Sequence, residues 1–286
     1  MAISKKVVGR YAPSPTGDLH LGNIRTALLA WLQVRSLGGK FLLRMEDLDT
    51  PRVVKGSAEQ ILSDLKWLGI DWDGDVVYQS RRTHLYQGAL ETLTEQGLIY
   101  PCYCSRKDIQ QAASAPHSQG VIYPGTCRNL TNEQRAEKAK FKIPSLRVKV
   151  DGDLLNSCGD FVVKRADGLF AYQMAVVVDD LEQSVTHVLR GQDLLESTSR
   201  QQYLASKLSP QSHEIQYKHV PLMLDDAGMR LSKRDGSLSV AEYKSQGYSA
   251  QRLIGDLAFS LGLLDSKEFT GLRGLLNNIN EKLDML

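Results

Sequence analysis

Residues 7–32 read VVGRYAPSPTGDLHLGNIRTALLAWL, and their pattern predicts a strand, a loop and a helix. The stretch opens as a short apolar strand over residues 7–11 and continues through a loop punctuated by proline and glycine. A helix then starts near Gly22. Its apolar residues recur at the spacing of one buried stripe, which comprises Ile24, Ala27, Leu28, Trp31 and Leu32. A strand followed by a helix that packs back on it is the first step of a sheet with crossover helices.

The next residues repeat this order. A strand is predicted over residues 41–45, and a further helix begins near Ser57, which has the spacing of a capping box with Gln60. Alternating strands and helices favour parallel strands, and both faces of a parallel sheet must be covered. The prediction is an α/β protein with a doubly wound, Rossmann-like sheet. Ligands of such sheets bind at the carboxyl ends of the strands, so the loop 12–23 and the acidic cluster 46–49 should line the site.

Farther along, the periodicity is weaker. We predict that an inserted module interrupts the sheet domain, which resumes with strands over 161–163 and 174–178, a helix over 192–207 and a strand over 219–223. The expected domains are a first catalytic half, the inserted module, a second catalytic half and a helical tail, over residues 1–97, 98–160, 161–240 and 241–286.

Composition limits the class of protein. The chain has 286 residues, of which 42% are hydrophobic and 24% charged, the balance of a globular protein. No apolar run is long enough for a membrane helix and the N-terminus has no signal-peptide pattern, so a cytoplasmic protein, expected to be a monomer, is predicted. The net charge of +2 neither requires nor excludes a nucleic-acid partner.

One stretch is locally basic. Residues 128–150 hold seven lysines and arginines against Glu133 and Glu137. Two interpretations stay open: an ordinary solvated face, or a contact with the phosphates of a nucleic acid, for which Arg81 and Arg82 are further candidates.

Two short motifs suit phosphate binding. His20, Gly22 and Asn23 lie where a loop becomes a helix, and a helix N-terminus offers unpaired N–H groups and a positive dipole end. The second motif is a basic loop that ends in glycine, residues 230–236, in which Ser232, Lys233 and Arg234 could close over a polyphosphate. Each motif alone is weak, because a capping histidine and a solvated basic loop are both common.

Together, these motifs resemble those of a known family. Residues 9–28 are similar to the opening signature of glutamyl-tRNA synthetases. His20–Asn23 (HLGN) resembles their HIGH motif, Arg230–Arg234 their KMSKS loop, and Arg44–Asp49 (RMEDLD) their R-[IM]-E-D-T-D element. The order is the family's order over about residues 7–240. Three departures, Asn23 for the second histidine, Arg230 for the first lysine and Arg234 at the end of the loop, bear on rate more than on reaction type.

The resemblance implies roles for individual residues. Arg10, Ala12 and Ser14 would line the amino-acid pocket, Glu46 would hold the α-amino group, and Tyr172 and Arg190 would contact the glutamate side chain. An arginine fork suits a carboxylate, although Arg190 could instead form an ion pair with an acidic neighbour. ATP, as its Mg²⁺ complex, would be held by His20, Gly22, Asn23, Ser232, Lys233 and Arg234, with His20 and Lys233 stabilising the charge of the transition state.

Only 52 residues follow Arg234, too few for an anticodon-binding domain. With the cysteine-containing insert, this resembles the glutamyl-queuosine tRNA(Asp) synthetases. The resemblance implies tRNA-independent activation of L-glutamate and its transfer to queuosine, the modified wobble base in the anticodon arm of tRNA(Asp). The alternatives are a minimal glutamyl-tRNA synthetase that charges the tRNA 3′ end, and a non-catalytic tRNA-binding paralogue.

Three of the four cysteines, Cys102, Cys104 and Cys127, lie close together in sequence. In a reducing compartment such a cluster indicates a metal site before a disulfide. Three thiolates leave tetrahedral zinc one ligand short. The resemblance suggests Tyr123 as the fourth ligand of one structural Zn²⁺. His117 is the chemically more ordinary alternative for this ligand. The simplest alternative is three free thiols without a metal.

Overall fold

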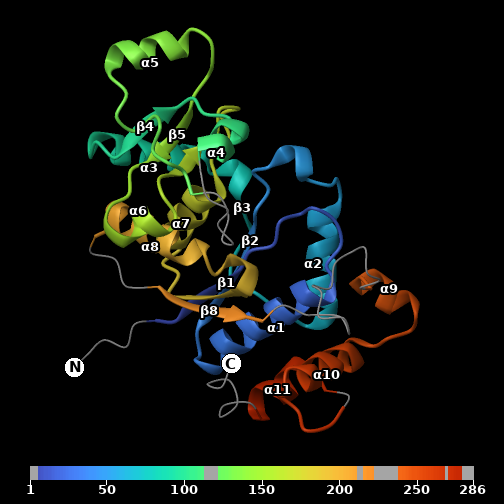
Figure 1. Cartoon of the computed structure of the whole chain (residues 1–286). Coiled ribbons are helices and arrows are strands. Elements are labelled where there is room, and N and C mark those ends of the chain that lie inside the picture. Colours follow the sequence, from blue (N-terminus) through green and yellow to red (C-terminus); the bar gives the residue numbers. More distant parts are fainter. Residues whose placement is uncertain (1–5, 113–121, 211–214, 222–237, 268–269, 279–286) are drawn as a thin grey trace, which may run out of the picture. The chain divides into compact units, whose positions relative to one another are not determined.

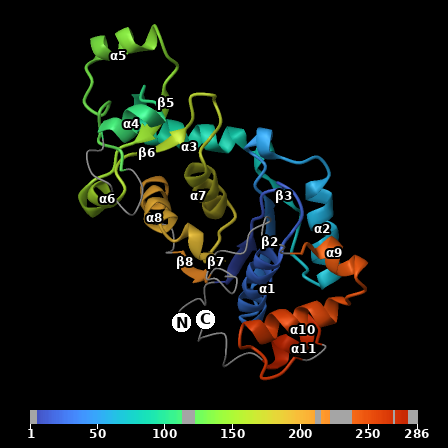
Figure 2. The same ribbon diagram turned by 45° about the vertical axis from the view of Figure 1, so that its right-hand side comes forward.

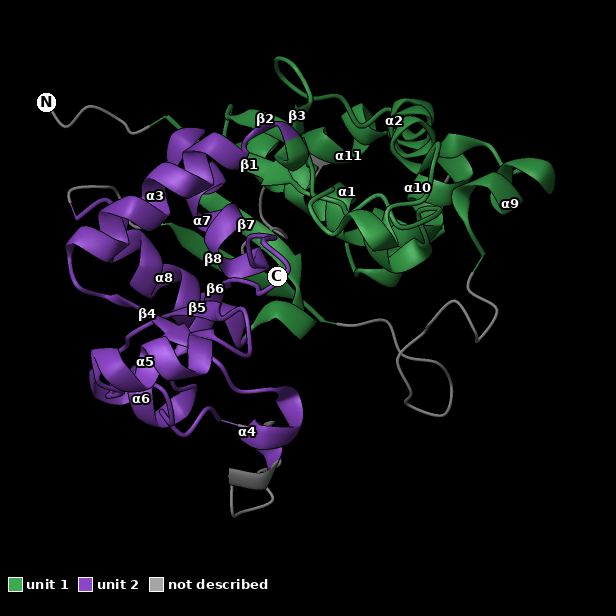
Figure 3. Cartoon of the chain, turned by 90° about the horizontal axis from the view of Figure 1, so that it is seen from above, with its two compact units in different colours: residues 1–80, 184–195, 213–286 green, residues 81–183, 196–212 purple. Residues whose placement is uncertain are grey.

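The protein is described from a computed structural model that covers residues 6–112, 122–210, 215–221, 238–267 and 270–278. The chain forms two compact units, coloured separately in Figure 3. The first comprises residues 1–80, 184–195 and 213–286, and the second residues 81–183 and 196–212. Each unit is described by itself. No helix in the described ranges has the length and apolar character needed to cross a membrane.

The first unit contains a parallel five-stranded sheet, as the sequence predicts. Its strand order is β3-β2-β1-β7-β8, and every registered pair is parallel. The strands are β1 (Val8–Tyr11), β2 (Lys40–Met45), β3 (Val77–Tyr78), β7 (His187–Gly191) and β8 (Gln216–Val220). The strand β1 therefore lies in the middle, and the loop that leaves its carboxyl end lies centrally on the sheet edge where ligands bind in this class of fold.

Helices cover one face of this sheet. The helix α1 lies along β1 and β7, and α10 and α11 lie beside it (Figure 2). Their apolar residues join Tyr11, Leu43 and Leu189 in one buried cluster. The helices of this unit are α1 (Leu21–Ser36), α2 (Ser57–Leu68), α9 (Val240–Ser245), α10 (Ala250–Ser260) and α11 (Leu272–Asn278), with 3-10 turns at Thr50–Arg52, Gln79–Arg81 and Gln192–Leu194.

The second unit contains a separate antiparallel sheet of order β4-β5-β6. Its strands are β4 (Ile99–Cys102), β5 (Ser145–Val148) and β6 (Phe161–Lys164). The helices are α3 (Thr83–Glu95), α4 (Arg106–Ala112), α5 (Asn132–Ala139), α6 (Gly152–Ser157), α7 (Tyr172–Glu182) and α8 (Ser197–Leu208), labelled in Figure 1. The helices α3, α7 and α8 pack together, and the hydroxyl of Tyr86 on α3 donates to the buried carboxylate of Asp179 on α7 at 2.9 Å.

Two strands predicted for the second half are wrong, one in its sheet and one in its type. Residues 161–164 form a strand, but it belongs to the antiparallel sheet. Residues 174–178 lie inside the helix α7 and not in a strand. All five of these residues are buried, so the stretch reads as one continuous apolar run in which helical and strand periodicity look alike. The helix predicted over 192–207 is a 3-10 turn followed by α8.

The capping box predicted at Ser57 is also absent. The N-cap of α2 is Gly56, in a left-handed conformation with a φ of 83°. The Ser57 hydroxyl donates to the Gly17 carbonyl at 2.7 Å and accepts from the Gly17 N–H at 3.1 Å. The Gln60 amide donates to Asp64 at 2.9 Å. Ser57 therefore fastens the loop after β1 to the start of α2.

Candidate active site

Three buried arginines share the sheet face opposite the apolar cluster. Arg10 on β1, Arg44 on β2 and Arg190 on β7 are 4%, 0% and 4% exposed. The register pairs Arg10 with Leu42 and Gly9 with His187. Because side chains alternate between faces along a strand, the three arginines fall on one side and Tyr11, Leu43 and Leu189 on the other. Buried guanidinium groups stay charged, and three of them on one side of the sheet make this face suited to an anionic ligand.

Glu46 lies at the edge of the same region. Its carboxylate is 3.8 Å from Nη2 of Arg44, and its side chain is only 11% exposed. The Glu46 N–H donates to the Pro13 carbonyl at 2.9 Å, which ties the end of β2 to the loop after β1. One carboxylate therefore lies beside a buried arginine, and a ligand with both an ammonium group and carboxylates requires groups of both charges.

The loop after β1 carries Ala12 and Ser14. Besides the bond from Glu46, Val54 N–H donates to Pro15 at 2.9 Å and Thr16 N–H donates to Ser14 at 2.8 Å. Gly17 takes a φ of 128°, which favours glycine. This network holds the loop backbone in one conformation, with Ser14 exposed.

The start of α1 is the second part of the site. His20 is its N-cap, and the His20 N–H donates to Oδ1 of Asn23 at 3.3 Å. Asn23 thus caps the helix. At the position where the HIGH motif has its second histidine, this residue therefore has a structural role. A Cβ added to Gly22 would meet no protein atom within 4 Å, so the position leaves room for a ligand at the helix N-terminus.

A hollow of about 460 Å³ adjoins His20. Polar side chains line it from the α1 start and from α9, and its lining comprises Asp18, His20, Ser239, Ala241, Glu242 and Ser245. The backbone joins the two sides, since Val240 N–H donates to the Leu19 carbonyl at 3.1 Å. The hollow has the polarity and size of a site for a polar small molecule.

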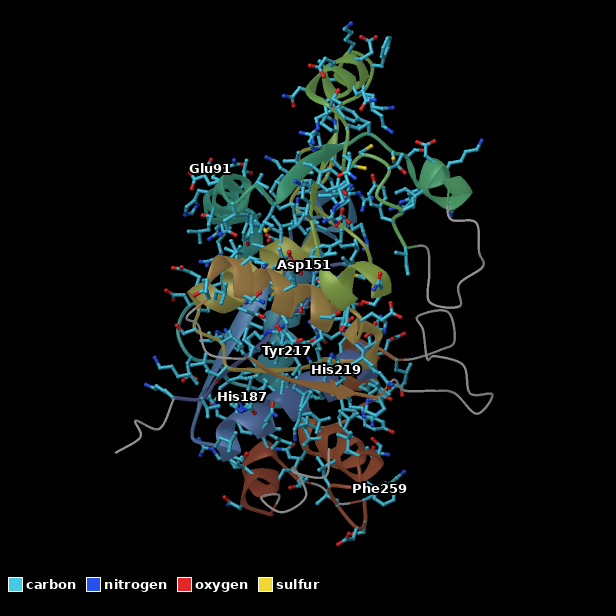
Figure 4. All side chains as sticks on the ribbon, turned by 60° about the vertical axis from the view of Figure 1, so that its left-hand side comes forward. Glu91, Asp151, His187, Tyr217, His219 and Phe259 are labelled. Atoms are coloured by element: carbon cyan, nitrogen blue, oxygen red, sulfur yellow. The ribbon has the colours of Figure 1, made fainter. Side chains whose placement is uncertain are left out.

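Arg190 has two neighbours on β8 that the sequence did not indicate. Its Nε donates to Nε2 of His219 at 3.2 Å, and its guanidinium lies 5.0 Å from the ring centre of Tyr217. Figure 4 labels Tyr217 and His219 on this strand. No sequence signal could have found this arrangement, because it depends on the register that sets Arg190 opposite His219.

The remaining predicted site residues are not among the described residues of the first unit. Tyr172 is the first residue of α7 in the second unit and is half-buried. Ser232, Lys233 and Arg234 lie outside the described residues, as does His117.

The cysteine cluster of the second unit has a geometry that can hold a metal ion. The sulfurs of Cys102, Cys104 and Cys127 lie within 4.8 Å of one another, with Cys104 and Cys127 3.6 Å apart. The Tyr123 hydroxyl lies 3.4 Å from the Cys102 sulfur and 3.9 Å from the Cys104 sulfur. It also accepts from the Cys127 N–H at 2.8 Å. Four potential ligands therefore converge on one point.

The protonation of this cluster depends on its surroundings. Burial and the neighbouring Cys102 raise the pKa of Cys104 to about 11. Burial also acts to raise the pKa of Cys102, but hydrogen bonds with Tyr123, the Cys104 backbone and Arg147 outweigh it and hold that pKa below its ordinary value. Arg147 is 8% exposed and stacks 3.8 Å from the Tyr123 ring centre.

Arg147 shows that the basic stretch is not one surface patch. Its Nη1 donates to the Asp160 carbonyl at 2.7 Å, and Arg128 forms an ion pair with the buried Asp160 carboxylate at 2.5 Å. Arg82 is similarly paired with buried Asp179 at 2.6 Å. Several of the cations counted in the sequence therefore stabilise the second unit from within.

Comparison with known proteins identifies the class. The family described as "tRNA synthetases class I (E and Q), catalytic domain" matches residues 6–282, and the chain belongs to this family. Its similar relatives include proteins named glutamyl-Q tRNA(Asp) synthetase. The one from Nocardia farcinica is 49% identical over 267 residues, covering 89% of this chain and 85% of the relative, and the one from Symbiobacterium thermophilum is 48% identical over 286 residues, covering 91% and 88%.

Solved structures agree on the fold. The glutamate-tRNA synthetase of Elizabethkingia anophelis matches with a TM-score of 0.81 at 27% identity. The glutamate tRNA ligase of Elizabethkingia meningosepticum, solved in complex with its amino acid, matches with a TM-score of 0.80 at 28% identity. Each match covers 96% of this chain but only 66% and 64% of the longer synthetases.

Proposed function

We propose that this chain activates L-glutamate with ATP, without needing tRNA, and transfers the glutamyl group to queuosine at the wobble position of tRNA(Asp). The observation that carries the first step is the face of three buried arginines beside Glu46. The names of the relatives at 48–49% identity support the acceptor.

Within this proposal, the glutamate pocket uses groups of both charges. Arg190, with Tyr172, contacts the side-chain carboxylate, and Glu46 accepts hydrogen bonds from the α-ammonium group. Arg10, Ala12 and Ser14 line the pocket from β1 and its loop. The Glu46–Pro13 hydrogen bond of 2.9 Å supports this arrangement, because it holds the ammonium-binding carboxylate against that loop.

ATP is assigned to the start of α1 and the hollow beside it. His20, Gly22 and Asn23 serve the phosphates together with Ser232, Lys233 and Arg234. An oxygen of the glutamate α-carboxylate attacks the α-phosphorus, and the bond to the β-phosphate breaks to release pyrophosphate. His20, Lys233 and the helix N-terminus, together with the Mg²⁺ that accompanies ATP, stabilise the charge that develops.

In the second step a hydroxyl of the queuosine cyclopentenediol attacks the glutamyl carbonyl carbon. AMP leaves, and the hydroxyl proton is lost to solvent. No side-chain nucleophile is required. The exposed cations of residues 128–150, on and beside α5, together with Arg81, remain candidates for the anticodon arm, whereas the buried partners of Arg82, Arg128 and Arg147 make these three poor candidates.

We also propose that Cys102, Cys104, Tyr123 and Cys127 hold one structural Zn²⁺. Zinc–sulfur bonds of about 2.3 Å put the sulfurs of a tetrahedral site about 3.8 Å apart, close to the 3.6 Å between Cys104 and Cys127. A bound zinc ion cross-links segments that otherwise share a small apolar cluster. We propose further that residues 98–160 act as an inserted module, and that the protein is a cytoplasmic monomer.

The acceptor is tested by transfer of labelled glutamate. The protein, ATP and Mg²⁺ are incubated with tRNA(Asp) that carries or lacks queuosine, with both tRNAs blocked at the 3′ end. We expect label only in the queuosine-containing tRNA. Label on the unblocked 3′ end of tRNA(Glu), with none on queuosine, would make the protein a minimal glutamyl-tRNA synthetase and overturn the proposed acceptor.

A further inference from the structure

Arg190 is held by two side chains of the neighbouring strand. Arg190 and His219 are direct register partners on β7 and β8, and Tyr217 lies two residues before His219. Register partners and alternate residues share a face, so all three side chains lie on the arginine-lined face. The contacts agree, with 3.2 Å from Arg190 Nε to His219 Nε2 and 5.0 Å from the guanidinium to the Tyr217 ring centre.

The direction of the hydrogen bond fixes the state of His219. An arginine can only donate, so Nε2 of His219 must accept and carries no proton. The imidazole is then neutral, with its proton on Nδ1. Burial, and after it the charge of Arg190, lowers the pKa of His219, so this acceptor persists at neutral pH.

These contacts also restrict how Arg190 can meet a carboxylate. A guanidinium has two bidentate edges, one formed by Nε with an Nη and the other by the two Nη groups. Because Nε of Arg190 donates to His219, bidentate binding of a carboxylate has to use Nη1 and Nη2. The Tyr217 ring beside the guanidinium restricts rotation of its plane.

We propose that His219 and Tyr217 are positioning residues that orient Arg190 so that the glutamate side-chain carboxylate binds end-on to its two Nη groups. The proposal rests on the function proposed above, in which Arg190 recognises this carboxylate. It adds that specificity for the substrate depends on a neutral histidine that touches neither substrate nor ATP. Preorganisation of this kind reduces the entropy lost when the substrate binds.

The test measures glutamate-dependent exchange of pyrophosphate into ATP, without tRNA. His219→Leu removes the acceptor, whereas His219→Gln keeps one, since an amide oxygen at that position reaches about as far as Nε2. Tyr217→Leu removes the ring and Tyr217→Phe retains it. His187→Leu is the matched control, because His187 lies on the same strand as Arg190 but on the opposite face of the sheet.

We expect His219→Leu to raise the KM for glutamate about tenfold, the typical effect of a lost hydrogen bond to a charged group. The kcat and the KM for ATP should change by less than about twofold, because the contact acts in substrate binding. His219→Gln should restore most of the affinity. Tyr217→Leu should raise the KM for glutamate, while Tyr217→Phe and His187→Leu should not.

Two results would overturn the proposal in different ways. The positioning role alone is rejected if folded His219→Leu has an unchanged KM for glutamate. It is also rejected if His219→Leu and His187→Leu lose kcat equally. Absence of glutamate-dependent exchange in the unsubstituted protein rejects the proposed function, and this inference with it. Circular dichroism and the Tm of each variant verify that the comparison is between folded proteins.

Discussion

At the scale of single residues, Glu46 is the residue whose charge, in the proposed function, distinguishes an amino acid from other carboxylates. Glu46→Gln keeps the shape but removes the charge that faces the ammonium group. We expect the KM for glutamate to rise at least about tenfold, the effect of losing a charge-assisted hydrogen bond. The measurement is pyrophosphate exchange at varied glutamate concentration. Glu91→Gln on the exposed face of α3 is the control, and equal kinetics of both variants would reject the role of Glu46.

Ser57 is a second residue whose role follows from its contacts. Its two hydrogen bonds to Gly17 fix the loop that carries Ala12 and Ser14. Ser57→Ala should lower the free energy of unfolding by about 1 kcal/mol, measured by urea denaturation. Gln60→Ala should have a smaller effect, since Gln60 does not cap α2. A larger loss of unfolding free energy in Gln60→Ala than in Ser57→Ala would favour the capping box that the sequence suggested.

The sequence singles out some residues of the candidate site, whereas the contacts of others are seen only in the structure. Arg10 and Glu46 could be singled out as candidates because motifs contain them, and Arg190 because it matches a position of the family. His219, Tyr217 and Arg147 could not, because their partners lie on other strands and only the register or the packing brings them together. Asn23 looked like a departure from a catalytic motif, yet its side chain caps the helix.

At the scale of elements, the strands β7 and β8 each carry a histidine with a lowered pKa. Burial lowers the pKa of His187, and Lys218 on β8 adds to the effect. Burial and Arg190 do the same for His219. Below about pH 6.5, the ordinary histidine value, the unfolded chain therefore binds more protons than the folded chain. This contribution to stability is complete above that pH and decreases as the pH falls toward the lowered pKa values.

We therefore expect the Tm to fall between about pH 7.5 and pH 5.5. The double variant His187→Gln, His219→Gln should lose less of its Tm over the same interval, because glutamine does not titrate. Thermal unfolding of both proteins across this range tests the assignment. An equal loss in both would mean that other groups cause the acid sensitivity.

The errors in predicted elements have two physical causes. The helix α1 was predicted well because proline and glycine punctuate the chain around it, although its residues 27–32 are all buried. The helix α7 was mistaken for a strand because its central residues are buried on every side. The strand β6 was predicted as an element but assigned to the wrong sheet, since local pattern carries no information about strand partners.

At the scale of the whole molecule, the metal site should stabilise the second unit. The purified protein should contain about one zinc per chain, and a strong chelator should lower its Tm. Tyr123→Phe should weaken zinc retention, measured by competition with a chromophoric chelator. Cys158→Ser is the control, since Cys158 lies outside the cluster. If Tyr123→Phe leaves the zinc content unchanged, the fourth zinc ligand would be His117 or solvent and not Tyr123.

The basic stretch shows what charge counting cannot resolve. Seven cations between residues 128 and 150 looked like one possible nucleic-acid contact. The structure divides them: Arg128 and Arg147 serve Asp160 inside the second unit, whereas α5 has no buried residue. Ion pairs and hydrogen bonds within the fold, which the sequence does not show, decide which lysines and arginines remain available to a nucleic acid.

In the proposed function, the arginine face and Glu46 form a site that activates glutamate without help from tRNA. Pyrophosphate exchange in the absence of any tRNA tests it most directly, with glutamate, glutamine and aspartate compared at equal concentration. We predict exchange with glutamate and little with the other two. Exchange that requires tRNA, or that prefers glutamine, would contradict the account.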